Sequence, residues 1–95
     1  MSYELRLSDD AERDLARVPL FLINFVESQL HRLAANPVTL SRPSVFPFPP
    51  GFQMFFFRFD DPGGDAHNFT ALFRYSADET AIIVSSIGYW PTTSD

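Results

Sequence analysis

Two arginines in the second half of the chain, Arg58 and Arg74, are candidates for binding an anion. A guanidinium group can donate two parallel hydrogen bonds to a phosphate or a carboxylate. Each arginine also has an aspartate close in sequence, Asp60 and Asp78, and surface ion pairs of this kind contribute little. The sequence therefore favours a structural interpretation, in which each arginine pairs with its neighbouring aspartate or lies over aromatic rings.

His67 follows a turn that contains three aspartates, Asp60, Asp61 and Asp65, so a metal site is conceivable. These ligands share one short loop, however, and their spacing matches no calcium-binding loop. A solvated acidic turn is the favoured interpretation. Thiolate zinc sites and disulfides are excluded because the chain has no cysteine. We expect no metal and no other cofactor.

The string Tyr89-Trp90-Pro91 can stack on a nucleic-acid base or anchor a protein contact. The formal net charge is −5, and all seven basic residues are arginines, with no lysine among them. Phosphate binding draws on basic side chains, so this balance disfavours nucleic acids and anionic membranes as general partners. The protein contact is the favoured interpretation for Trp90.

Aromatic residues occupy both faces of one predicted strand, where Phe55, Phe57 and Phe59 alternate with Met54, Phe56 and Arg58. Successive side chains of a strand point to opposite faces, so only one of the two sets can face the core. The other set forms an apolar patch unless the proline-rich loop, a partner or a second copy covers it. We assign the interface to Phe55, Phe57, Phe59 and Trp90.

Hydrophobic periodicity and turn residues predict the elements that position these side chains. They are a strand over 3–7, helices over 9–18 and 20–35, a proline-rich irregular loop over 38–51, strands over 52–59, 67–76 and 80–89, and a polar tail over 91–95. Two helices with so short a link must pack as an antiparallel hairpin. The prediction is an α+β fold of order βααβββ, in which the hairpin covers one face of a mostly antiparallel four-stranded sheet and leaves the other face partly open.

The 95 residues are enough for one domain, and eleven phenylalanines supply its core. We therefore predict a single domain over 1–95. The first residues lack the long apolar segment of a secretory signal, and no run approaches 18 apolar residues. Together with the absence of cysteine, this predicts a cytoplasmic protein with no membrane partner.

Three strings in this order and spacing resemble the RelE/ParE superfamily of bacterial toxins. They are residues 5–15 (LRLSDDAERDL), residues 30–37 (LHRLAANP) and residues 73–84 (FRYSADETAIIV), the last followed by Ser86-Ile87-Gly88. The resemblance implies the α+β fold predicted above and a small toxin that an antitoxin segment neutralises. RelE-type members cleave messenger RNA in the ribosome, whereas ParE-type members inhibit DNA gyrase.

The basic positions of the ribosome-dependent nucleases are largely replaced in this chain. Met54 and Phe56 stand where these nucleases commonly carry Lys or Arg, and residues 69–71 (FTA) replace an arginine-bearing string. The sequence after Gly88 is Tyr89-Trp90 in place of the usual basic pair. Cleavage of RNA needs a proton acceptor, a proton donor and cations for the phosphorane charge.

The residues left for that chemistry are Arg58, Arg74, Tyr89 and His67. We therefore predict a toxin-like protein that acts mainly by binding protein, with an antitoxin or a second copy as partner. Nucleic acid is expected only through the ribosome. The alternatives are a ribosome-dependent endoribonuclease that uses Arg58, Arg74 and Tyr89, and a ParE-like gyrase inhibitor.

Overall fold

The computed structural model describes residues 2–44 and 48–92. Five strands form one sheet in the order β1-β5-β4-β3-β2, in which β1 is parallel to β5 and the other neighbours are antiparallel. The strands are β1 (Glu4–Leu7), β2 (Arg42–Pro43), β3 (Gln53–Asp60), β4 (Ala66–Tyr75) and β5 (Ala81–Thr92). This confirms the predicted α+β class and the mostly antiparallel sheet.

The predicted loop over 38–51 contains more regular structure than its prolines suggested. Pro37 does not simply stop a helix, because it opens the single-turn helix α3 (Pro37–Leu40), where a proline lacks only a hydrogen bond that the first helical residue never makes. The two-residue strand β2 then pairs with Gln53 and Met54, which makes the sheet five-stranded and not four-stranded. Residues 45–47 of this loop and 93–95 of the predicted tail lie outside the described residues.

The helical part comprises α1 (Asp9–Ala16), the 3-10 helix η1 (Leu20–Leu22) and α2 (Ile23–Ala35). The Ser8 hydroxyl caps α1 by accepting a hydrogen bond from the Ala11 backbone N–H. Pro19 separates α1 from η1, as its fixed backbone and missing N–H predict. Along α2, the side chains of Val26, Leu30 and Leu33 are buried and form an apolar stripe that faces the core.

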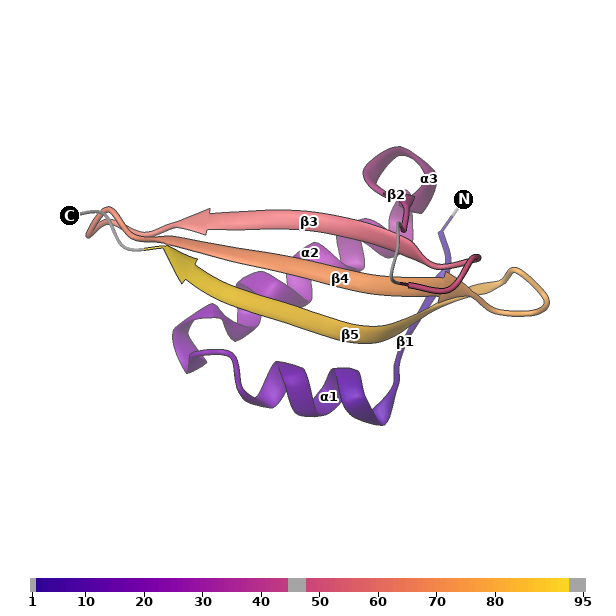
Figure 1. Ribbon diagram of the computed structural model, residues 1–95, viewed down its shortest axis with the longest axis horizontal. Helices are drawn as coiled ribbons and strands as arrows, with labels where there is room; N and C mark the ends of the chain where they lie inside the picture. Colours follow the sequence, from indigo (N-terminus) through magenta and orange to yellow (C-terminus); the bar gives the residue numbers. More distant parts are fainter. Residues whose placement is uncertain (1, 45–47, 93–95) are drawn as a thin grey trace.

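Both long helices lie on the same face of the sheet and run antiparallel to each other (Figure 1). Ala11 and Val18, within and just after α1, share one core cluster with the stripe of α2 and with inward-facing residues of β3, β4 and β5. Beyond Val84, β5 no longer has β1 as its neighbour, and α1 lies beside it instead. The carboxylate of Asp14 accepts a hydrogen bond from the Ile87 backbone N–H at this point, 2.9 Å away.

Aromatic rings fill the space between α2 and the sheet. The ring of Phe25 on α2 lies 5.1 Å from that of Phe59 and 6.0 Å from that of Phe57, measured between centroids. Phe57 stacks in turn on Phe69, at 5.0 Å with an interplanar angle of 9°. Offset stacked pairs of this kind add stabilisation to the burial of their apolar area. Among the described residues, no helix is long and apolar enough to cross a membrane.

We expect Phe69→Ala to lower the free energy of unfolding by about 3–5 kcal/mol, because this fully buried ring contacts three other rings and its removal leaves a cavity. Phe56→Ala, on the opposite face of the sheet, is the matched control and should cost about 0.5 kcal/mol or less. Urea denaturation of both variants measures the difference. Equal losses would contradict the assignment of the two faces.

Candidate functional site

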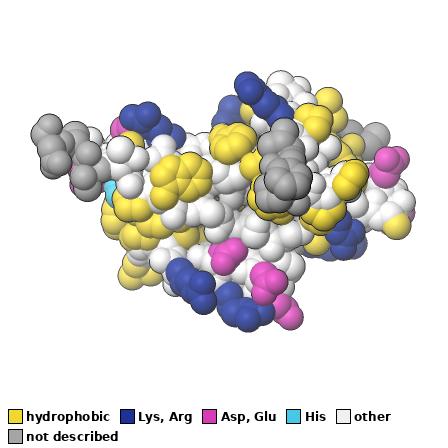
Figure 2. Space-filling model, in the orientation of Figure 1, with side chains coloured by type: hydrophobic (Ala, Val, Ile, Leu, Met, Phe, Trp, Pro, Cys, Tyr) yellow, Lys and Arg dark blue, Asp and Glu magenta, His cyan; other side chains and the backbone are white. Residues whose placement is uncertain are grey.

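The helix-free face of the sheet, here called the open face, carries the candidate site. Strand alternation and cross-strand register place Met54, Phe56 and Arg58 of β3 on this face, opposite Leu72, Thr70 and Asn68 of β4. On β5 the same rows continue to Ser86, Gly88 and Trp90. Figure 2 looks onto this face and shows hydrophobic side chains over the strands, with Arg side chains at its rim.

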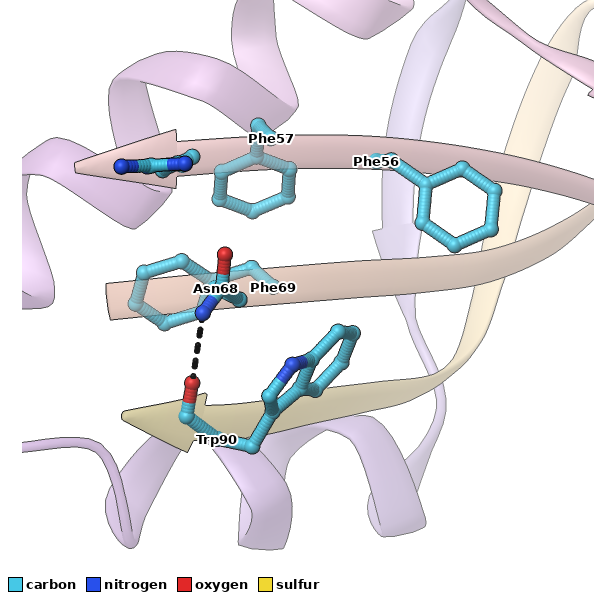
Figure 3. Close-up of a pocket in the computed structure, with 6 residues that line it drawn as sticks. Phe56, Phe57, Asn68, Phe69 and Trp90 are labelled. Carbon is cyan, nitrogen blue, oxygen red and sulfur yellow. Dashed lines mark hydrogen bonds between the residues drawn. The ribbon is translucent and has the colours of Figure 1, made fainter. Parts of the chain in front are cut away.

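Two aromatic side chains on the open face are exposed to an extent unusual for their size. Phe56 is 56% exposed and Trp90 is 47% exposed. They border a shallow hollow of about 200 Å³ that Arg58 and Asn68 also line. In Figure 3, Phe56 and the Trp90 indole stand on either side of β4, with Asn68 between them at one end. The hollow thus combines two apolar walls with a guanidinium and an amide.

Local sequence holds the Trp90 side chain in place. The indole lies beside Gly88, where an added Cβ would be 3.7 Å from the ring, an ordinary van der Waals distance. The Asn68 amide donates hydrogen bonds to the Trp90 carbonyl, at 3.1 Å, and to the Thr92 hydroxyl, at 3.0 Å. These bonds join the last residues of β5, from which the Trp90 indole projects, to β4.

Of the four predicted interface residues, only Trp90 lies on the open face. Phe55, Phe57 and Phe59 point to the helices, where Phe55 is 3% exposed and the other two pack against Phe25. The prediction assigned the wrong set of β3 side chains to the exposed face, because phenylalanine occurs in both of the alternating sets of this strand. The exposed partner of Trp90 is therefore Phe56.

The three predicted catalytic residues do not converge. Arg58 and Arg74 both lie on the open face, but Arg58 pairs with Asn68, six residues along β4 from Arg74, which corresponds to about 20 Å of strand. Tyr89 pairs with Phe69 and points to the helix-covered face. Arg58 also forms the ion pair predicted for it, with its Nε and Nη2 at 2.8 Å and 2.7 Å from the Asp60 carboxylate.

The helix-covered face holds a polar cluster that the sequence analysis did not assemble. His67 is not part of a solvated turn, because its side chain is nearly buried in β4. Its Nε2 lies 2.8 Å from the Asp61 carboxylate, and its Nδ1 lies 2.8 Å from the Tyr89 hydroxyl. The alternation of β4 and β5 was the available signal, since it places His67 and Tyr89 on the same face as Phe69. Among the residues that the structure describes, no group of three or more His, Cys, Asp or Glu could hold a metal ion.

Charge is distributed unevenly between the two sides of the molecule. Alternation and register place four of the seven arginines on the open face, namely Arg6, Arg42, Arg58 and Arg74, together with the carboxylates of Glu4 and Asp60. Arg42 and Arg74 form no ion pair with another described residue. The open face therefore carries a net charge of about +2, whereas the rest of the chain, with three arginines and ten carboxylates, carries about −7 at neutral pH.

The fold matches two solved structures over most of the chain. A chain of the toxin–antitoxin complex RelBE2 from Mycobacterium tuberculosis aligns with a TM-score of 0.74 and 18% identity, covering 95% of this chain and 93% of that one. The Escherichia coli toxin RelE, as a double arginine-to-alanine mutant in the free state, aligns with a TM-score of 0.61 and 11% identity, covering 93% and 83%. This chain has the RelE fold. No protein-family model matches the sequence, and no curated protein matches it.

The RelE fold confirms the architecture that the three sequence strings implied. In this fold the helices of the present chain cover one face of the sheet and leave the other free, so the open face is the surface on which its distinctive side chains are displayed. The arginines at its rim and the exposed aromatic pair Phe56 and Trp90 are the features that a functional hypothesis must explain.

The Asp61 carboxylate offers a test of the cluster on the other face. Its hydrogen bond from His67, together with those from the Asp65 and Gly63 backbones, lowers the pKa of Asp61 below its ordinary value of 3.8. A carboxyl group with a lowered pKa stabilises the fold above pH 3.8, and this contribution is lost as the pH falls through the folded-state value. We expect His67→Phe to raise the Asp61 pKa toward 3.8 and to lessen the loss of stability on acidification below about pH 4.

Carboxyl NMR titration of both proteins measures the shift. Asp78 is the internal control, because hydrogen bonds from Ser76 and Thr80 lower its pKa to about 2 with no contribution from His67. Its titration should be the same in both proteins. An Asp61 pKa that does not move would contradict the hydrogen-bond assignment.

Proposed function

We propose that this protein is the toxin-like member of a cytoplasmic toxin–antitoxin pair, that it acts by binding protein, and that the open face is its binding surface. The observation that carries the proposal is the exposed aromatic pair, Phe56 and Trp90, on a sheet face that no element of the described chain covers. Aromatic side chains in such hollows are the residues that dominate protein–protein affinity.

The fold supports the choice of partner. The similar RelBE2 structure is a toxin–antitoxin complex, and we infer that this chain likewise has an antitoxin polypeptide as its ligand. The charge of the open face favours a segment with apolar side chains for the hollow and carboxylates for Arg42 and Arg74. A second copy of the chain is disfavoured, because two open faces would oppose like charges of about +2 each.

The arrangement of the candidate catalytic residues supports binding over RNA cleavage. Stabilising a phosphorane requires donors that point together at one small volume. Arg58 is held by Asp60, Arg74 lies far along the sheet, and Tyr89 occupies the other face. Inhibition of a protein target needs no such convergence.

The binding surface is tested by truncating its aromatic side chains. We expect Trp90→Ala and Phe56→Ala each to weaken binding of the antitoxin at least about 10-fold, because loss of a central interface aromatic costs about 2 kcal/mol or more. Leu20→Ala is the control, since Leu20 is 89% exposed but belongs to η1 on the helix side. The protein is co-expressed with the product of the neighbouring reading frame, the complex is purified, and affinities are measured by calorimetry.

Two outcomes of that experiment would count against the open face. One is that Leu20→Ala weakens the complex while Trp90→Ala leaves it intact. The other is that no partner copurifies and expression of the protein alone leaves growth unaffected, which would refute a toxin–antitoxin pair.

The ribonuclease alternative gives the opposite expectation for the arginines. We expect purified protein to leave ribosome-bound messenger RNA intact, and we expect any growth arrest that the protein causes to occur without cleavage of the message. Primer extension on translated message measures cleavage, and growth curves after induction measure arrest. Cleavage that disappears in Arg74→Ala would establish the nuclease and overturn the proposal.

A further inference from the structure

The hydrogen-bonded chain Asp61–His67–Tyr89 lies away from the open face and is not used by the proposed function. Its two bonds are both 2.8 Å long, from the Asp61 carboxylate to Nε2 and from Nδ1 to the Tyr89 hydroxyl. The side chains of His67 and Asp61 are only 9% and 18% exposed. The chain joins three elements, because Asp61 begins the turn after β3, His67 lies in β4 and Tyr89 lies in β5.

The direction of the hydrogen bonds follows from the state of Asp61. Its Oδ1 accepts hydrogen bonds from the backbone N–H groups of Gly63 and Asp65, at 2.9 Å and 3.1 Å, which favours the ionised carboxylate. An ionised Asp61 can only accept, so Nε2 of His67 carries the hydrogen of that bond. Nδ1 of a neutral imidazole is then an acceptor, and the Tyr89 hydroxyl donates to it.

This order of donors is that of a nucleophile backed by a base and an orienting carboxylate. The Tyr89 hydrogen is held by His67, so the lone pairs of its oxygen are left for another group. Burial raises the pKa of Tyr89 above 10.0, with a further contribution from the charge of Asp61. The Tyr89 hydroxyl is therefore protonated at neutral pH. If its oxygen attacks an electrophile, the phenolic proton must pass to His67 as the new bond forms.

Tyr89 also borders a second hollow of about 200 Å³, where the end of α1 faces β5. Arg17, Asp14, Val18 and Ile87 line the rest of it. The Asp14 carboxylate is engaged by the Ile87 backbone, whereas Arg17 forms no side-chain hydrogen bond or ion pair with another residue of 2–44 or 48–92. Arg17 and Tyr89 therefore line the same hollow, and a guanidinium there suits a ligand that carries negative charge.

We propose that Tyr89 is a nucleophile for a small anionic electrophile of the phosphoanhydride class, with His67 as its base and Arg17 as the group that holds the anion. The Tyr89 oxygen forms a bond to phosphorus, and the phosphorus–oxygen bond to the leaving phosphate or carboxylate breaks, so that the leaving group departs with the electron pair. The phenolic proton moves to Nδ1 of His67, and Asp61 stabilises the resulting imidazolium.

The other two tyrosines serve as internal controls. Burial also raises the pKa of Tyr75, but no histidine in the part of the chain that the structure describes hydrogen-bonds to its hydroxyl or to that of Tyr3. A purely structural role for the cluster predicts that the hydrogen bond lowers the reactivity of Tyr89 to that of Tyr75 or below. A base-assisted nucleophile predicts that Tyr89 reacts fastest.

The test uses 4-(fluorosulfonyl)benzoate, whose tetrahedral sulfur and carboxylate imitate an anionic phosphorus electrophile. Because the chain contains no lysine and no cysteine, few other nucleophiles compete. Rates of labelling at each tyrosine are followed by peptide mass spectrometry. We expect Tyr89 to be labelled at least about 10-fold faster than Tyr3 and Tyr75, as base assistance commonly contributes 10²-fold or more.

Three variants separate the roles, with thermal melting as a check that each is folded. Asp61→Asn should reduce labelling of Tyr89 at least about 10-fold by removing the charge that orients His67. Arg17→Gln should slow the carboxylated reagent but leave uncharged benzenesulfonyl fluoride unaffected, and Tyr89→Phe should remove the label. Labelling of Tyr89 that is no faster than that of Tyr75, or that is unchanged in folded Asp61→Asn, would overturn the proposal.

Discussion

The packing of α2 against one face of the sheet determines nearly everything else about this molecule. Phe25 contacts rings from β3 and β4, and the stripe of Val26, Leu30 and Leu33 extends that contact along the helix. The helices of this short chain form one layer, and they pack entirely against the aromatic core on one face of the sheet. No helix of residues 2–44 and 48–92 therefore lies over the other face of the sheet, although that face carries large apolar side chains. An exposed apolar surface on a small protein calls for a partner.

The parts of the fold that local rules govern could be predicted from the sequence. Helix α2 follows from the three-to-four residue spacing of its apolar side chains, and the start of α1 follows from the run Ser8-Asp9-Asp10. The strands β3, β4 and β5 lie within one to three residues of their predicted bounds. Strand β2 could not be predicted, because two residues, one of them a proline, have no periodicity and form a strand only by pairing with Gln53 and Met54 of β3.

The phase of β3 shows where pattern alone fails. Phenylalanine occurs at 55, 57 and 59 on one face of the strand and at 56 on the other, so both faces carry aromatic side chains. Arg58 and Asp60 share a parity, and a charged pair costs far less at a solvated surface than in a core. That parity was the usable signal for the open face, and it would have placed Phe56 there in place of Phe55, Phe57 and Phe59. Register then brings Phe56 and Trp90 to the same hollow, although they are far apart in sequence.

The cluster of Asp61, His67 and Tyr89 depends on pairing between strands, which explains why the sequence conceals it. His67 and Tyr89 are neighbours only because β4 and β5 pair with Phe69 opposite Tyr89. The same pairing places Tyr89 on the opposite face from Arg58. The register of β4 and β5 therefore separates two of the predicted catalytic residues and also brings Tyr89 to His67. The sheet thus divides its polar chemistry between two faces. Arginines and exposed aromatics on the open face suit recognition of a surface, whereas a buried histidine between a carboxylate and a phenol suits transfer of a proton.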